Sequence, residues 1–241
     1  MRPNDHELRL GFEQCLHEPR AYGLPNPVSH LRNNESDAHL AIRSILNLGH
    51  GPVRYPRNKV ISLEGDPADY IIIVGEGVLR TCRAFKDGHR TIVGFHVSGE
   101  LVGFTDEATH ALCIEASTNS TVLLLNRIAI RTLAARDNRV ANFLLANTAK
   151  ELKRLQEHSV LINRRAQCRV ATFLIDLSVR LGKARCLDLP MSHQDIADFL
   201  GLTIETLSRV ITEFERAKFI SRVSVRTLVL TNRESLIRIM D

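Results

Sequence analysis

The sequence predicts an α+β fold, in which a β-rich N-terminal half is joined by a long helix to a helical C-terminal part. Three observations predict this fold: runs of β-branched residues separated by glycines, an apolar heptad repeat, and a pair of short amphipathic helices. The predicted divisions are an N-terminal arm (1–50), a β-roll (51–136), a long helix (137–165) and a C-terminal domain (166–241).

The arm has no clear periodicity. Prolines interrupt it, and a short helix is expected only over Ala38–Leu48. One cysteine and several histidines lie in it, and their spacing matches no common zinc pattern. These residues are His6, Cys15, His17, His30 and His39. We expect scattered surface histidines here, and no metal site.

The next segment reads as strands and turns. Short runs rich in β-branched residues, such as Tyr70–Val74 and Thr91–Phe95, alternate with turns at Asp87–Gly88 and Gly99. The turns recur at intervals of about ten residues, which is typical of an antiparallel barrel or roll.

A heptad repeat follows. Apolar or small residues step by four and three through Ala141, Leu145, Thr148, Leu152, Leu155, Ser159 and Ile162. This pattern predicts a helix of roughly 33 Å with an apolar seam, through which two copies would dimerise. The dimer contacts expected are Leu145, Leu152, Leu155 and Ile162. A helix that packs on its own domain remains the alternative.

The C-terminal part begins with a second predicted helix, about Arg165–Leu181, and a linker over Lys183–Pro190. After the helix pair, Ile220–Arg226 and Thr227–Leu230 fit a β-hairpin, and a last helix is expected near Glu234–Met240.

The helix pair lies within Met191–Ile220. Ser192 and Thr203 are good N-caps, and Gly201 supplies the turn between the helices. On the second helix an apolar stripe comprises Leu207, Val210, Ile211 and Phe214, and a polar stripe comprises Glu205, Ser208, Arg209 and Thr212. This spacing fits a DNA-reading helix-turn-helix and an ordinary helical hairpin equally well.

The residues themselves separate these alternatives. QDIADFLGLTIETLSR, at 194–209, resembles the recognition unit of the Crp/Fnr superfamily, with the Glu-x-x-Ser-Arg signature of its Fnr/FixK branch. GEGVLRTCRAFKDGHRTIVGFHVSGELVGF, at 75–104, resembles the cyclic-nucleotide-binding-like sensor domain of that superfamily, a double-stranded β-helix. The resemblance implies a homodimeric DNA-binding transcription regulator with a C-terminal winged helix-turn-helix.

The ligand chemistry of the relatives is incomplete in this chain. Gly99, Glu100 and Gly103 are present, but Thr109–Cys113 lacks the Arg-Ser pair that holds a cyclic phosphate. An iron–sulfur cluster needs closely spaced thiolates, and Cys15, Cys82, Cys113, Cys168 and Cys186 form no C-x-x-C pair. The resemblance therefore implies a FixK-type regulator without cofactor. A haem-gated or small-molecule-gated regulator of the same fold is the alternative.

Charge and composition agree with such a protein. Residues 1–138 carry 15 Lys+Arg and 16 Asp+Glu, a net of −1, and residues 139–241 carry 17 and 11, a net of +6. The basic half favours an anionic partner. No apolar run approaches the ~20 residues of a membrane span, and the first residues lack a signal-peptide core, so we expect a cytoplasmic protein without a membrane partner. No catalytic motif indicates an enzyme.

The resemblance also assigns roles. Arg209 would contact guanine, Glu205 would accept from cytosine and pair with Arg209, and Ser208 would lie near thymine, in inverted half-sites of the type TTGAT-N4-ATCAA. Supporting or phosphate contacts are expected from Gln194, Thr206, Thr212, Arg222 and Arg226.

Two regulatory features are expected. FixK-type proteins are mainly activators, in low-oxygen or nitrogen-related gene control, and the turn Lys86–Gly88 with Arg90 lies where the family meets RNA polymerase. Repression remains possible on the residues alone. Cys186, which follows Arg185 in the linker, is a candidate redox site.

Overall fold

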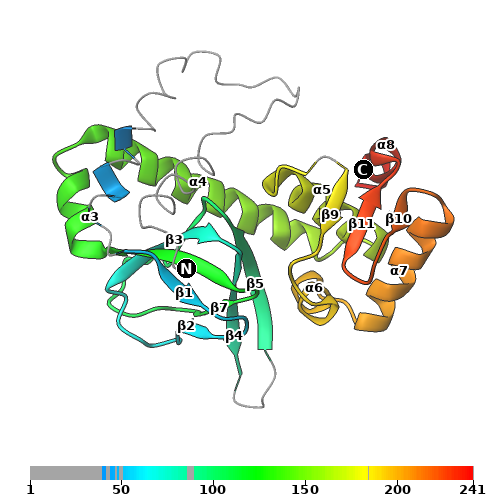
Figure 1. Ribbon diagram of the computed structural model, residues 1–241, viewed down its shortest axis with the longest axis horizontal. Coiled ribbons are helices and arrows are strands. Elements are labelled where there is room, and N and C mark those ends of the chain that lie inside the picture. The colour runs from blue at the N-terminus through cyan, green and yellow to red at the C-terminus, as the bar shows by residue number, and fades with distance from the viewer. Residues whose placement is uncertain are drawn as a thin grey trace, which may run out of the picture.

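The computed structural model describes residues 40–41, 44–46, 48, 51–85, 90–183 and 185–240. A long helix, α4 (Asn138–Leu161), runs along a β-roll toward a smaller helical domain (Figure 1). The predicted α+β architecture is confirmed. Residues 40–41 and 44–46 are helical, and the rest of the arm up to residue 39 lies outside the described residues.

The β-roll consists of two four-stranded antiparallel sheets. The first has the order β1 (Val53–Tyr55), β8 (Ser120–Asn126), β3 (Tyr70–Glu76), β6 (Leu101–Val102). The second has the order β2 (Val60–Ser62), β7 (Cys113–Ala116), β4 (Val78–Ala84), β5 (Arg90–Val97). Inward-facing residues of both sheets, among them Ile72, Leu79 and Ile114, form a buried cluster within the roll.

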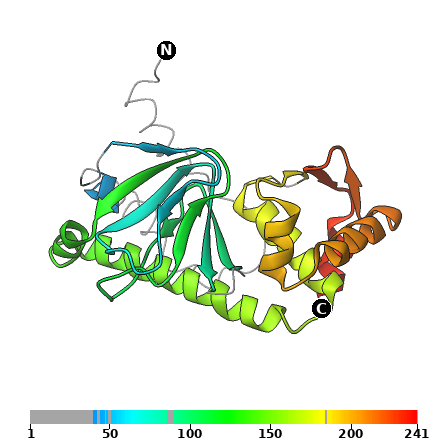
Figure 2. The ribbon, with the colours of Figure 1, turned by 90° about the horizontal axis from the view of Figure 1, so that it is seen from below.

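Two helices follow the β-roll. The side chain of Asn126 caps α3 (Arg127–Ala134), and that of Asp137 caps α4 (Asn138–Leu161). Figures 1 and 2 show α4 running along the roll toward the C-terminal domain. Its last turn ends at Leu161, with Ile162 as the C-cap, because the chain must bend to an extended Arg165 before the next helix. The helix is therefore shorter than the predicted 137–165.

The C-terminal domain is a winged helix-turn-helix. Its elements are α5 (Ala166–Arg180), β9 (Cys186–Asp188), α6 (His193–Leu200), α7 (Ile204–Arg216), β10 (Ile220–Arg222), β11 (Thr227–Leu230) and α8 (Arg233–Met240). The wing has three strands rather than two, since β9 pairs antiparallel with β11. The predicted linker thus contains a strand. Three residues are too few to show a two-residue period in the sequence.

The two domains share one apolar core. The outer face of the second sheet contributes Val78, Ile92 and Phe95 to the same cluster as the helices of the C-terminal domain. The Phe95 ring lies 6.2 Å from that of Phe173 on α5 and 5.3 Å from that of Phe199 on α6, both edge-on. The position of α6 against the β-roll is therefore fixed by packing as well as by the chain connection.

Within the described ranges, no helix combines the length and apolar character needed to cross a membrane.

Candidate nucleic-acid interface

The local chemistry of the helix-turn-helix is as the sequence predicts. The Ser192 hydroxyl accepts a hydrogen bond from the Asp195 N–H, and the Thr203 hydroxyl accepts one from the Thr206 N–H. Gly201 ends α6 in the left-handed conformation (φ 60°), which a side chain would strain. These caps fix where α6 ends and α7 begins, and confirm the predicted turn.

The two stripes of α7 lie on different faces. Leu207, Val210, Ile211 and Phe214 are buried in the domain core. Glu205, Ser208 and Arg209 are exposed together. Thr206 and Thr212 are half-buried, and the Thr212 hydroxyl donates to the Ser208 carbonyl at 2.9 Å. The polar stripe therefore offers three side chains to a partner, with the two threonines at its margin.

Glu205 is oriented toward the start of its own helix. Its pKa lies below the usual value because its carboxylate accepts from its own backbone N–H and from the Thr203 hydroxyl. In the part of the chain that the structure describes, no ion pair joins Glu205 to Arg209, although their spacing predicts one. The N-terminal N–H groups of α7 offer the carboxylate a fixed alternative partner.

The expected phosphate-contacting residues flank this helix. Gln194 is exposed and donates to Asp198 at 2.7 Å. The Arg222 guanidinium on β10 lies 3.8 Å from the Glu215 carboxylate, and Arg226 is exposed in the wing turn. His193, at the start of α6, has a lowered pKa, first through burial and then through Arg222 and Arg226. The two arginines of the wing thus form a positive patch beside the start of α6.

Arg169 holds the turn of the motif, and the sequence analysis missed it. Its guanidinium on α5 donates to the carbonyls of Leu200 (2.9 Å) and Gly201 (3.1 Å), at the end of α6. These are carbonyls that a helix C-terminus leaves without intrahelical partners. No local sequence pattern links α5 to this turn.

An ionic cluster at the domain interface was also missed. Asp195 on α6 is 2% exposed and binds Arg80 on β4 at 2.8 Å and Arg90 on β5 at 2.7 Å. Arg80 also binds Glu115 on β7 at 2.6 Å. Asp195 therefore anchors the first helix of the motif to the β-roll. Arg90, which follows the turn expected to meet RNA polymerase, has its guanidinium on Asp195, and Lys86–Gly88 lies outside the described residues.

A second ionic cluster joins α4, α5 and the β-roll. Glu100 binds Arg154 at 2.6 Å and Arg180 at 2.7 Å, and accepts from the Val97 N–H at 3.0 Å. Burial alone would raise the pKa of Glu100, but Arg180 and then Arg154 bring it below its usual value. Glu100, retained from the ligand-binding pattern of the cyclic-nucleotide relatives, is thus engaged by arginines of this chain.

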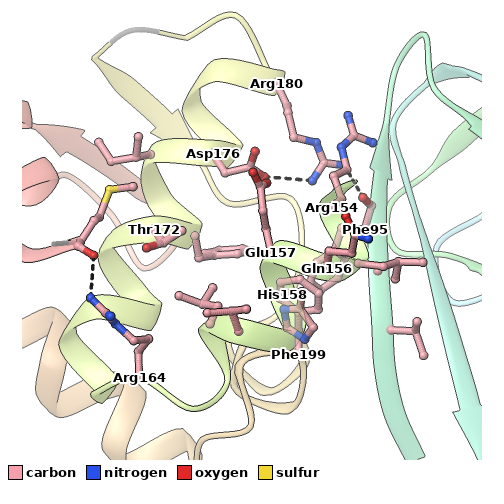
Figure 3. A pocket seen from close by; sticks show the side chains of 18 of the residues that line it. Phe95, Arg154, Gln156, Glu157, His158, Arg164, Thr172, Asp176, Arg180 and Phe199 are labelled. Atoms are coloured by element: carbon pink, nitrogen blue, oxygen red, sulfur yellow. Dashed lines mark hydrogen bonds and ion pairs between the residues drawn. The ribbon is translucent and has the colours of Figure 1, made fainter. Parts of the chain in front are cut away.

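Two cavities adjoin these contacts. A cavity of about 160 Å³ in the β-roll is lined by Thr81, His96, Gly103 and His110, and lies well below the size usual for ligand pockets. A larger one, of about 760 Å³, lies between β5, α4, α5 and α6. Figure 3 shows Arg154 and Arg180 beside each other at its edge, with His158 against Phe199.

The long helix exposes most of its predicted seam. The exposed fractions are 68% for Leu145, 55% for Leu152, 43% for Leu155 and 41% for Ile162. Val160, which the heptad pattern did not include, is 67% exposed. Apolar side chains in a row on one helix form the kind of surface that a partner covers.

The cysteines are less scattered than their spacing suggested. Strand pairing brings Cys82 and Cys113 together in the β-roll, where both are buried. Cys168 is buried in α5, and Cys186 is exposed on β9 rather than in a linker.

Known proteins resemble this chain over most of its length. Residues 52–137 match the cyclic nucleotide-binding domain model, and residues 168–239 match the Crp-like helix-turn-helix domain model. The nitrogen fixation regulation protein FixK of Rhizobium meliloti is 38% identical over 200 residues, which covers 79% of this chain and 90% of that protein. The transcriptional activatory protein AadR of Rhodopseudomonas palustris is 32% identical over 217 residues, covering 82% and 90%.

A solved structure agrees with these relatives. FixK2 from Bradyrhizobium japonicum is similar with a TM-score of 0.76 and 35% identity, over 80% of this chain and 98% of that one. The matched domain models cover the β-roll and the winged motif, and the second range includes Glu205, Ser208 and Arg209. The chain therefore belongs to the Crp/Fnr superfamily, as a FixK-type DNA-binding transcriptional regulator.

Proposed function

We propose that this protein is a homodimeric activator that reads an inverted repeat of the type TTGAT-N4-ATCAA through α7. The observation that carries the proposal is the exposed group Glu205, Ser208 and Arg209 on one face of a helix whose opposite face is buried. Side chains so presented can reach base edges in the major groove.

Each side chain has a distinct role in this reading. The Arg209 guanidinium offers forked donors to guanine O6 and N7, Glu205 accepts from cytosine N4, and Ser208 lies near thymine. Arg222 and Arg226 are long, exposed cations beside the motif and contact phosphates, as do Gln194, Thr206 and Thr212. Cys186, exposed on the wing strand β9, is the proposed site of redox control.

The dimer forms through the exposed seam of α4. Leu145, Leu152, Leu155 and Ile162 of one copy pack against the same residues of the other, giving a two-fold arrangement. Two recognition helices related by that axis require two inverted half-sites about one helical turn apart. The symmetry of the expected DNA site thus follows from the symmetry of the helix pair.

The protein acts in the cytoplasm, without a cyclic nucleotide or cluster, and contacts RNA polymerase when it activates. The engagement of Glu100 by Arg154 and Arg180 and the small β-roll cavity favour ligand-independent binding. The naming of these relatives as nitrogen fixation regulation proteins supports control of nitrogen-related genes, and control of low-oxygen genes is proposed with it.

A gel shift with the purified, ligand-free protein tests this function. We expect binding to TTGAT-N4-ATCAA and none to a scrambled duplex at the same protein concentration. Binding that begins only after haem or another small molecule is added would favour the gated alternative. The visible spectrum of the purified protein is the matching check for haem.

Arg209→Ala should weaken binding to the specific duplex by about 1–3 kcal/mol and relax the choice of base at its guanine. The reason is the loss of a bidentate contact that only guanine satisfies. Titrations on specific and random duplexes measure the effect. The control is Arg216→Ala, at the C-terminal end of the same helix, which should leave the ratio of the two affinities unchanged. Equal loss on both duplexes for Arg209→Ala would contradict the assignment.

Arg222→Ala should weaken binding to all duplexes alike and reduce the salt slope, −dlogK/dlog[salt], by about one unit. Arg222 is expected to neutralise one phosphate, so its removal leaves one fewer counterion to release. Affinities at several salt concentrations measure the slope. A loss confined to the specific duplex would assign Arg222 to base reading instead.

A further inference from the structure

Two thiols and a carboxylate meet on the face of the β-roll that packs against the C-terminal domain. Antiparallel pairing of β4 with β7 places Cys82 directly opposite Cys113, and Arg80 opposite Glu115. Because alternate residues share a face, all four side chains project to the same side of the sheet. The two sulfur atoms and a Glu115 oxygen lie within 4.8 Å of one another, and the Cys113 Sγ is 3.8 Å from Glu115 Oε1.

We propose that Cys82, Cys113 and Glu115 form a binding site for a thiophilic divalent cation, with Zn²⁺ as the fitting ion. Zinc bonds of about 2.0–2.3 Å in a tetrahedron require donor atoms about 3.4–3.8 Å apart. The separations in this cluster, one of 3.8 Å and none above 4.8 Å, are close to that range. Three protein donors leave a fourth position for water. This site lies outside the β-roll cavity and uses none of its lining residues.

The charges around the cluster allow a dication to be exchanged for two protons. Without an ion both thiols are protonated, since burial raises the pKa of Cys82 and raises that of Cys113 to about 12. The negative charges of Glu115 and Asp195 are then balanced by the positive charges of Arg80 and Arg90. A bound Zn²⁺ with two thiolates adds +2 and −2, so this balance is unchanged. The cluster can therefore take up the ion without leaving a net buried charge.

The same carboxylate connects the proposed site to the domain interface. Glu115 Oε1 faces the thiols, while its Oε2 lies 2.6 Å from Arg80, which in turn binds Asp195 of α6. A bound ion would hold Glu115, and through it Arg80, in the position that anchors α6. The ion would act as a structural support of the interface, and this inference does not depend on the DNA sequence that α7 reads.

The test uses the full chain with Cys15, Cys168 and Cys186 replaced by Ala, so that only Cys82 and Cys113 remain. Cd²⁺ is the spectroscopic probe, because its thiolate complexes absorb in the ultraviolet. We expect the absorption to saturate at one Cd²⁺ per chain and to be reversed by a large excess of Zn²⁺. Native mass spectrometry should find one Zn²⁺ bound with the loss of two protons.

Two further variants identify the ligands. In the two-cysteine background, the variant with both Cys82→Ala and Cys113→Ala should bind no Cd²⁺. The Glu115→Gln variant should bind Cd²⁺ at least about tenfold more weakly. Circular dichroism establishes that each variant is folded. Three results would overturn the site: no thiolate absorption in the folded two-cysteine protein, undiminished binding without Cys82 and Cys113, or a Cys82–Cys113 disulfide that forms in place of metal binding.

Discussion

Leu152→Glu should convert the protein to monomers and lower its affinity for a duplex with two half-sites by about 100-fold or more. Leu152 is 55% exposed at the centre of the α4 seam, and the seam leucines on either side of it, Leu145 and Leu155, are exposed as well. In a two-fold dimer two such glutamates would face each other in an apolar contact. Their desolvation and repulsion oppose association, and a monomer keeps only one half-site.

The measurement is sedimentation velocity, together with binding to duplexes with one and two half-sites. Lys150→Glu is the matched control, since it introduces the same side chain on the opposite side of the same helix, where Lys150 is exposed. It should remain dimeric. A Leu152→Glu protein that stays dimeric and binds normally would assign the dimer contact to another surface.

Asp195→Ala should lower the free energy of unfolding by about 3 kcal/mol, the lower end of the range for breaking a buried ion pair. Asp195 is 2% exposed and forms ion pairs with both Arg80 and Arg90. Its removal leaves the buried Arg80 with Glu115 and a longer hydrogen bond to Asn58, which moderates the loss. Because the contact joins two domains, α6 should also become less protected from amide hydrogen exchange.

Urea unfolding and hydrogen exchange measure these effects. Asp198→Ala is the matched control. Asp198 lies half-buried on the same helix, and its side chain accepts a hydrogen bond from the exposed Gln194. We expect a change within about 0.5 kcal/mol for this control, as is usual for surface substitutions. Equal losses for the two variants would show that Asp195 contributes helix stability rather than domain docking.

The sequence by itself determined the features that depend on neighbouring residues. The caps Ser192 and Thr203, the left-handed Gly201 and the two stripes of α7 all follow from short-range periodicity and capping chemistry. The family motif in residues 194–209 then distinguished a DNA reader from a plain helical hairpin. The heptad spacing likewise placed Leu145 and Leu152 on one face of a single helix.

Only the tertiary structure decided the contacts between distant segments. Asp195 looked like a helix-start residue, yet it anchors α6 to Arg80, 115 positions earlier in the chain. Cys82 and Cys113 looked scattered, because their meeting depends on the register of β4 and β7. Strand register, the packing of a sheet face against a helix and the pairing of buried charges are set by the whole fold. A pattern in the sequence does not show which strands become neighbours in the sheet.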